Sequence, residues 1–475
     1  MPFGPRHSSK LGAVTPSPRA LIPDVRYEIL QYLGIAEIKS YSQTSRALYD
    51  EAFPFIWRQA TVGGSSPSPE KSLIEFNNFI IANPGKAALI TSLSLCWTDG
   101  LLPLTPRPDD CEEINETTES FNLFRRAAAC FTQLKRLRVT RIHKHNVFID
   151  VTLIPSSVVR VFARSPIKLF AFCSSTNVDI HPQFLTECVA WKQTLTHLII
   201  DNLYCSGKAD VIPWPPLPVL RCLVTHEHDV VVHMLSVNPR VRSLYFTGKG
   251  DPQGSTSPWA SPFVLRDINK MCNNNVTTSE LRKFIVHCRG PHPSASFGQI
   301  LQAVKWQKLE EFTVFMDYNW WSPRGRIPLA EYVVAELSMA YAQFTSALPK
   351  LRKLHLRIQG NNNPVCTLQA NSAQHCTEAA AHLLELLERA SPSHPCIETI
   401  EIRSQGRMLT NYAICSIQAS RGESHQWEVK DSYENFPEDQ WDERSLYKEA
   451  WTRNDQPDYF DSRVPLHALE NMLTY

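Results

Sequence analysis

Large apolar residues recur along most of the chain in a six-residue unit of the form L-x-x-L-x-φ, where φ is aliphatic or aromatic. Alternation at the end of each unit is typical of a short strand that buries one side. Clear units lie at 134–139, 195–200, 241–246, 281–286, 309–314, 351–356 and 397–402. A shorter unit lies at 93–95, and weaker ones begin at Ile167 and Leu220. The pattern predicts a series of short strands.

Stretches with helical periodicity separate these strands. We expect helices at 72–82, 121–131, 296–306, 329–348 and 372–389. From residue 134 to residue 241, successive units begin 21 to 33 residues apart, close to the leucine-rich period of about 20 to 29 residues. After residue 281 the gaps widen to 28, 42 and 46 residues, which indicates insertions in the later units.

The repeated order of strand, crossover helix and parallel strand predicts an α/β fold. We expect residues 72–427 to form an irregular leucine-rich-repeat-like solenoid, with parallel strands on the concave side and helices outside. The Asn or Cys that normally follows each leucine-rich strand is mostly missing, because the ninth positions hold Leu203, Lys249, Asp317 and Gln359. A doubly wound α/β domain is the alternative.

A dense apolar block spans residues 20–62 and predicts three helices. Pro23 suits the first position of a helix that Gly34 ends. The apolar residues of one face of this helix are Ile22, Val25, Ile29 and Leu33. A second helix is expected at 37–43 and a third at 46–53, ending before Pro54.

This block is too small to hide its own apolar surface. Domains near about 40 residues usually need a disulfide, a metal or a partner, and residues 20–62 contain neither Cys nor His. We therefore expect part of its apolar surface to contact another protein. The alternative is that the block packs on the domain that follows it.

The flanking segments differ in composition from these two regions. Residues 1–19 are rich in Pro, Ser, Gly and basic residues and predict a disordered tail, and residues 63–71 predict a linker. Residues 428–475 hold twelve acidic and five basic residues. We expect this acidic segment to be a capping helix or a tail that contacts a basic partner, and we favour the cap.

Composition narrows the classes of partner and compartment. Lys plus Arg number 48 and Asp plus Glu 47, so no net charge directs the chain to nucleic acid or to an anionic membrane. The 13 cysteines form no closely spaced pair, which predicts mostly small buried thiols in a reducing compartment. Without a signal peptide or an apolar run of about 18 residues, we expect the protein in cytoplasm or nucleus.

The sequence contains no complete catalytic, metal-binding or cofactor-binding motif. The segment 248–254 is glycine-rich, but Gln253 replaces the third glycine of a phosphate-binding loop, so we interpret it as an ordinary loop. His226, His228 and His233 lack a fourth ligand for zinc. We therefore expect no catalytic residue, no metal and no cofactor.

The apolar block also contains an ordered motif. It reads Leu21 to Val25, Glu28 to Leu30, Leu33, Ile38, Ser42, Ser45-Arg46 and Phe53 to Arg58. Over about forty residues, this motif resembles the F-box of the large fungal F-box families. It departs from the common pattern at Ile22, where Leu is usual, and in the connection 34–37, where a Pro and an Asp often stand.

The resemblance implies a non-catalytic substrate receptor of an SCF-type cullin ubiquitin ligase. The F-box would bind a Skp-family adaptor, and through it a cullin, while the solenoid would bind an unknown protein substrate for ubiquitin-dependent degradation. The implied adaptor contacts are Leu21, Ile22, Pro23, Val25, Ile29, Leu30, Leu33, Ile38 and Trp57. The alternatives are a non-degradative interaction scaffold and an unrecognised α/β enzyme.

Long insertions in the solenoid are the candidates for target binding. They are 248–262, 318–323 and 360–364. Trp320 and Trp321 stand in the second of them, and Trp side chains often dominate interfaces. The alternative for either Trp is packing beneath its own loop.

Overall fold

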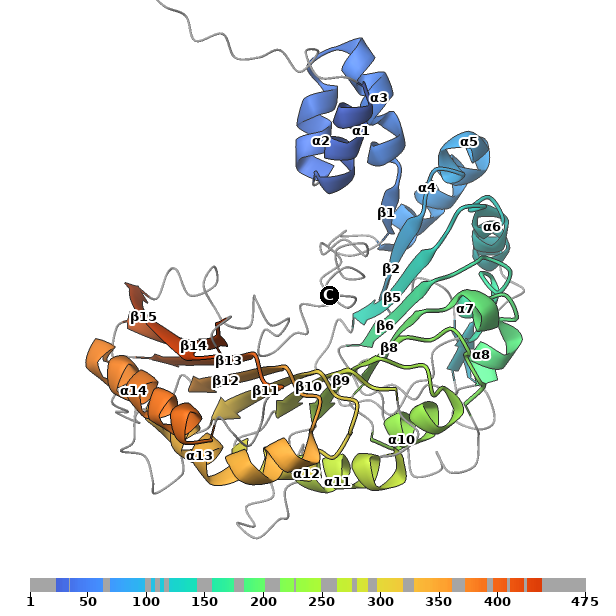
Figure 1. The fold of residues 1–475 in the computed structure, drawn as a ribbon. Helices are drawn as coiled ribbons and strands as arrows, with labels where there is room; N and C mark the ends of the chain where they lie inside the picture. Colours follow the sequence, from blue (N-terminus) through green and yellow to red (C-terminus); the bar gives the residue numbers. More distant parts are fainter. Residues whose placement is uncertain are drawn as a thin grey trace, which may run out of the picture. The chain divides into compact units, whose positions relative to one another are not determined.

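The computed structural model divides into a helical unit that ends at Gln59 and a sheet unit that begins at Ala60 (Figure 1). The described residues are 23–33, 35–62, 69–98, 104–106, 112–114, 119–142, 156–174, 183–200, 214–225, 228–248, 263–275, 280–288, 297–318, 329–360, 372–390, 396–407, 411–422 and 425–437. Among them, no helix is both long enough and apolar enough to cross a bilayer.

The helical unit contains α1 (Pro23–Tyr32), α2 (Ile35–Ser42) and α3 (Arg46–Ile56). The Ser45 side chain caps α3 by accepting a hydrogen bond from the Leu48 N–H. We expected α3 to end before Pro54, but it continues to Ile56. The reason is Phe55, which is buried in the core of the unit; its burial offsets the hydrogen bond that Pro54 cannot donate.

Thirteen strands of the described residues form one open sheet in the order β1-β2-β5-β6-β7-β8-β9-β10-β11-β12-β13-β14-β15. Their bounds are β1 (Gln59–Val62), β2 (Ser92–Thr98), β5 (Arg136–Ile142), β6 (Leu169–Ser174), β7 (His197–Ile200), β8 (Cys222–Thr225), β9 (Ser243–Gly248), β10 (Lys283–Cys288), β11 (Glu311–Tyr318), β12 (Lys353–Gly360), β13 (Thr399–Arg407), β14 (Asn411–Arg421) and β15 (Trp427–Pro437). A separate ribbon pairs β3 (Leu104–Pro106) with β4 (Glu112–Ile114).

Helices cover one face of this sheet (Figure 1). They are α4 (Pro69–Ala82), α5 (Pro84–Ala87), α6 (Glu119–Ala128), α7 (Ser156–Arg160), α8 (Gln183–Glu187), α9 (Trp191–Thr194), α10 (His228–Val237), α11 (Phe263–Asn275), α12 (Phe297–Ala303), α13 (Leu329–Ala347) and α14 (Ala373–Ala390). In the described part of the chain, the opposite face carries no helix, and we call it the open face. The expected parallel strands with helices on one side are confirmed.

The register explains the repeated sequence pattern. From β2 to β13 the pairing is parallel, and the fourth residue of each unit lies beside its counterpart in the next strand. This column is fully buried against the helices and contains Leu93, Leu137, Phe170, Leu198, Leu223, Leu244, Phe284, Phe312, Leu354 and Ile400. The apolar positions are therefore the core between sheet and helices.

The last strands break the parallel order. Strand β14 is antiparallel to β13, and β15 is antiparallel to β14. We expected residues 428–475 to be a separate helical cap or a tail, but residues 428–437 lie in the final strand of the sheet, and the rest lies outside the described residues. Similarly, residues 60–62 form most of β1 and belong to the sheet unit rather than to the helical block.

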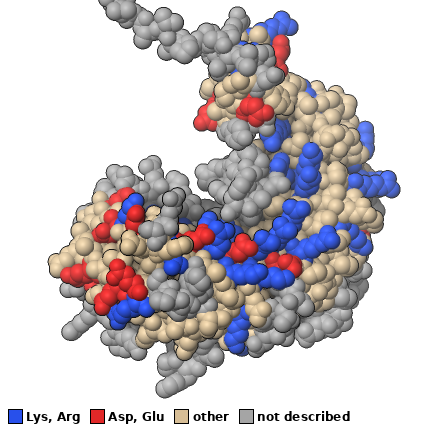
Figure 2. Space-filling view, in the orientation of Figure 1, with Lys and Arg blue, Asp and Glu red and all other residues tan. Residues whose placement is uncertain are grey.

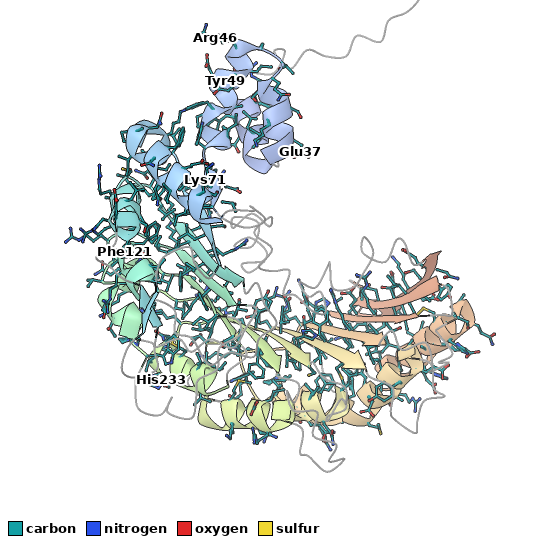
Figure 3. The ribbon with its side chains drawn as sticks, turned by 180° about the vertical axis from the view of Figure 1, so that it is seen from behind. Glu37, Arg46, Tyr49, Lys71, Phe121 and His233 are labelled. Atoms are coloured by element: carbon teal, nitrogen blue, oxygen red, sulfur yellow. A yellow bond between two sulfur atoms is a disulfide. The ribbon has the colours of Figure 1, made fainter. Side chains whose placement is uncertain are left out.

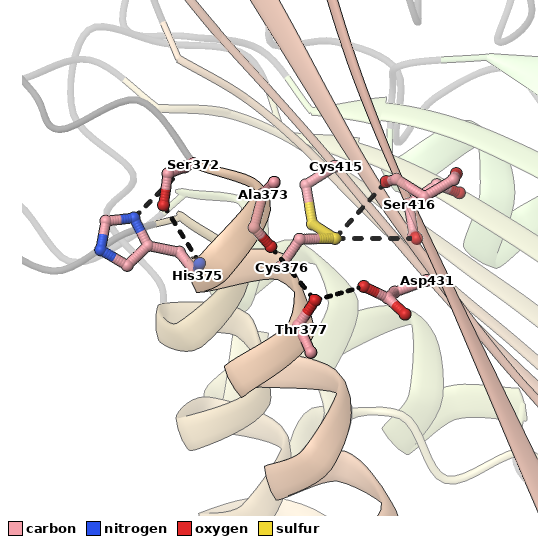
Figure 4. Close-up of a disulfide and its surroundings, with 9 residues drawn as sticks. Ser372, Ala373, His375, Cys376, Thr377, Cys415, Ser416 and Asp431 are labelled. Atoms are coloured by element: carbon pink, nitrogen blue, oxygen red, sulfur yellow. Dashed lines mark hydrogen bonds between the residues drawn. A yellow bond between two sulfur atoms is a disulfide. The ribbon is translucent and has the colours of Figure 1, made fainter.

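A disulfide between Cys376 and Cys415 joins α14 to β14 (Figure 4). Close by, Ser372 immediately precedes α14, and its hydroxyl accepts a hydrogen bond from the His375 N–H at 3.2 Å. Thr377 of α14 donates to Asp431 of β15 at 2.8 Å. We expected mostly free buried thiols. Four cysteines fit that expectation, Cys188, Cys222, Cys272 and Cys288, whereas the covalent link was missed because its partners lie 39 residues apart in sequence.

Candidate protein-interaction surfaces

The helical unit exposes large apolar side chains. Six are exposed among the described residues, and four of them belong to this small unit: Val25 at 38%, Tyr27 at 55%, Ile29 at 42% and Tyr49 at 43%. We call these four the exposed apolar set. Val25 and Ile29 stand one helical turn apart on α1, so they share one side of it, and Tyr49 of α3 can be found in Figure 3. Such a concentration on a small unit indicates a protein contact.

Three of the other predicted adaptor contacts belong to the interior of the helical unit. Leu30 and Ile38 are buried in its core, and Leu33 packs against that core. Trp57 is half-buried, with its ring 6.4 Å from that of Phe53. We therefore assign Leu30 and Ile38 to folding rather than to direct contact. Pro23 begins α1, while Leu21 and Ile22 lie outside the described residues.

A polar cluster ties the three helices together. The Arg26 guanidinium of α1 donates two hydrogen bonds to the Glu51 carboxylate of α3, at 2.8 and 3.1 Å. The Tyr41 hydroxyl of α2 donates to the same carboxylate at 3.1 Å. Burial and this hydrogen bond raise the pKa of Tyr41. Because the bidentate pair fixes α1 against α3, the exposed apolar side chains of these two helices are held in defined positions.

The open face of the sheet unit carries a polar and aromatic cluster on β10 to β13. His355 Nδ1 lies 2.7 Å from the Glu401 carboxylate, and an Arg357 guanidinium nitrogen lies 3.5 Å from it. The Phe315 ring meets the Arg357 guanidinium at 5.4 Å and the His287 ring at 5.9 Å. Parallel pairing aligns His287, Phe315 and Arg357 at one level, and His355 pairs with Glu401 two residues earlier along the strands. His287 and Phe315 are buried, and His355, Arg357 and Glu401 are half-buried, so the charges of this cluster pair mainly with one another.

The sequence contained a signal for this cluster. In the later units, the positions between the buried ones hold His355, Arg357, Glu401 and Arg403. In β6 to β9, six of the corresponding positions are apolar and form a separate buried cluster on the open face, made of Leu169, Ala171, Ile199, Cys222, Val224 and Tyr245. Successive side chains of each strand therefore point alternately to the helices and to the open face. The repeated sequence pattern predicts only the positions that point to the helices.

The Glu401 carboxyl should make stability depend on pH. Burial alone would raise its pKa, but the hydrogen bond with His355 and the charges of Arg357 and Arg403 outweigh burial and lower it from 4.5 to about 2. Because the pKa is lowered by folding, Glu401 stabilises the protein above pH 4.5, and this contribution is lost as the pH falls from 4.5 to about 2.

We expect Glu401→Gln to reduce the acid sensitivity of the sheet unit. Between pH 5 and pH 2, the free energy of unfolding of the wild type should fall by about 2 kcal/mol more than that of the variant, a value discounted for partial exposure. Urea titrations at several pH values measure this difference. A parallel fall in both proteins would show that Glu401 is not held ionised by its neighbours.

The predicted target-binding Trp320 and Trp321 lie outside the described residues, as do residues 249–262 and 361–364 of the other two insertions. His228 and His233 both lie on α10, whereas His226 is outside the described part. Within the described ranges, no group of three His, Cys, Asp or Glu side chains is arranged to hold a metal ion.

Comparison with known proteins gives little information. No protein-family model matches the chain, and no curated protein matches it. One solved structure with some similarity is the central domain of yeast acetyl-CoA carboxylase, at 12% sequence identity and a TM-score of 0.20. That match covers 45% of this chain and 39% of the other chain. A likeness this slight carries no argument about fold or function.

Proposed function

We propose that this chain is the substrate-recognition subunit of an SCF-type cullin ubiquitin ligase. In this proposal, the helical unit is an F-box that binds a Skp-family adaptor, and the sheet unit is a leucine-rich-repeat-like solenoid that binds a protein target. The observation that carries the proposal is the exposed apolar set. No catalytic group is needed in the chain, because other subunits of such a ligase transfer ubiquitin.

Two further observations support the assignment of the helical unit. Among the described residues, its core cluster contains four buried apolar side chains, Leu30, Ile38, Ala52 and Phe55, and Leu48 is buried outside that cluster. This is a small interior for an independent fold. The motif that resembles an F-box coincides with α1 to α3, and its Val25 and Ile29 are the exposed members of the face that we predicted.

Adaptor binding tests the proposal. The full chain is co-expressed with a Skp-family adaptor and captured, as wild type and as the double variant Val25→Asp with Ile29→Asp. Because each large apolar side chain buried at an interface contributes about 1.5–3 kcal/mol, we expect the variant to recover at least about tenfold less adaptor. The matched control is Val189→Asp with Met339→Asp, which changes the two large apolar side chains that are exposed in the described part of the sheet unit.

The control should recover as much adaptor as the wild type. Equal recovery by the Val25 and Ile29 variant would contradict the proposal, provided that its helical content is unchanged. Capture of the cullin through the adaptor tests the ligase role separately. Adaptor recovered without cullin would assign the chain to a non-degradative complex instead.

A further inference from the structure

Although the net charge of the chain is close to zero, one region of it is basic. Residues 125–248 contain fifteen Lys and Arg but seven Asp and Glu, whereas the whole chain has a net charge of +1. In the view of Figure 2, Lys and Arg side chains prevail over the part of the sheet unit that contains β2 to β9. Both signs are mixed over the part that contains β11 to β15.

Four of these cations form a row along the amino ends of the strands. Lys135, Lys168, Arg221 and Arg242 stand immediately before β5, β6, β8 and β9, two residues before the buried column. All four are exposed. Thr196 holds this place before β7. We call the four cations the basic row; with strands about 4.8 Å apart, it spans about 19 Å.

Backbone hydrogen bonds fix the spacing of the row. The Lys135 carbonyl accepts from the Lys168 and Leu169 N–H groups at 2.7 and 3.1 Å, and the Lys168 carbonyl accepts from Thr196 and His197 at 2.8 and 3.0 Å. The Arg221 carbonyl accepts from Arg242 at 2.8 Å. The cations are thus attached to a rigid edge rather than to a loop.

The residues that occupy the same place before the later strands neutralise one another's charges, whereas those of the basic row do not. From β10 onward, the same place holds Arg282, Glu310, Arg352 and Glu398, whose signs alternate, and neighbours pair at 3.2 Å and 2.7 Å. Among the described residues, the basic row makes no ion pair. The nearby carboxylate of Glu280 pairs with Lys308 at 2.5 Å and not with Arg242. The hydrogen bond and charge of Lys308, and more weakly the charge of Arg242, lower the pKa of Glu280. Like charges on adjacent strands are unfavourable, so folding alone does not account for the row.

We propose that the basic row binds an extended acidic peptide segment of a partner protein. A strand-like peptide of about six residues covers 19 Å, and its carboxylates would supply the counter-charges that the row lacks. This inference goes beyond the proposed function, because it concerns the sheet unit alone and holds whether or not the helical unit binds an adaptor.

The chemistry of the surface favours a peptide over nucleic acid. Single-stranded nucleic acid is usually bound by aromatic side chains on which bases stack. The exposed large apolar residues of the sheet unit, within the described ranges, are Val189 and Met339, neither of which is aromatic. Duplex DNA is typically held by about six to ten phosphate contacts, more than the four cations of the row provide.

Fluorescence anisotropy with the full chain tests this proposal. The probe is a labelled peptide of about twelve residues with alternating Glu and Ser, compared with its Gln and Ser counterpart, a single-stranded oligonucleotide of equal charge, and vesicles that contain anionic lipid. We expect the Glu peptide to bind, and its affinity to fall as salt rises from about 50 to about 300 mM. The quadruple variant Lys135→Gln, Lys168→Gln, Arg221→Gln, Arg242→Gln should bind at least about tenfold more weakly.

The matched control removes two Lys and two Arg elsewhere, as Lys71→Gln, Lys430→Gln, Arg46→Gln and Arg389→Gln, and should bind within about twofold of the wild type. Circular dichroism checks that each variant is folded, and the pair Lys135→Gln with Lys168→Gln replaces the quadruple variant if it is not. The proposal is overturned if the wild type does not bind the Glu peptide, if both quadruple variants weaken binding equally, or if the oligonucleotide or the vesicles bind more tightly.

Discussion

Replacing Phe284 by Ala should lower the free energy of unfolding of the sheet unit by about 3–5 kcal/mol. Phe284 is fully buried in the column that faces the helices. Its ring packs edge-on against Trp306 at 4.8 Å and stacks on Phe312 of the next strand at 5.4 Å. The substitution removes both ring contacts and leaves a cavity that neighbouring parallel strands, held by their hydrogen bonds, are poorly able to fill.

Urea denaturation followed by tryptophan fluorescence measures this loss. The control is Met339→Ala on α13, a side chain that is 67% exposed, for which we expect a change within about 0.5 kcal/mol. A loss below about 1 kcal/mol for Phe284→Ala would mean that the column is loosely packed. Because the chain has two units, more than one unfolding transition can occur. The transition of the sheet unit is the one whose fluorescence change persists when the helical unit is destabilised.

Much of this architecture follows from the periodicity of apolar residues. The same spacing that placed Phe284 in a strand also placed Leu137, Leu244 and Leu354, and the structure aligns them in one column. The expected helices at 329–348 and 372–389 correspond to α13 and α14. Such features are predictable because burial of one side of each element dominates the choice of residues there.

Other features left no such signal. Strand β15 is mostly polar and most of its described side chains are exposed, so residues 427–437 resemble a tail in composition although they pair fully with β14. An edge strand is stabilised by backbone hydrogen bonds on one side and needs no continuous apolar face. Trp427 and Val429, which pack against the main core, are the residues that would have indicated a strand.

The candidate surfaces were predictable in part. The F-box-like motif indicated an exposed apolar face on the first helix, and Val25 and Ile29 are exposed there. The basic row could not be predicted from the sequence, because Lys135 and Arg242 are more than a hundred residues apart and acidic residues elsewhere in the chain offset their charge. Only the parallel register brings such residues together.

Loss of the Cys376–Cys415 disulfide should lower the free energy of unfolding by about 2–4 kcal/mol. The bond closes a loop between residues 39 apart and joins α14 to the antiparallel end of the sheet, so its removal increases the conformational freedom of the unfolded chain. We expect Cys415→Ala to lower the melting temperature, and a reductant to lower that of the wild type but not that of the variant.

Two of the other described cysteines, Cys188 and Cys272, do not interfere with this comparison. Burial raises the pKa of the Cys188 and Cys272 thiols to about 12, so neither forms the thiolate that disulfide exchange requires near neutral pH. Cys396 is exposed and free, and Cys396→Ser is therefore the control that should leave both the melting temperature and the effect of reductant unchanged. If the reductant does not shift the melting temperature of the wild type, the two cysteines do not stabilise the fold as a covalent link, and α14 is held on β14 by packing alone.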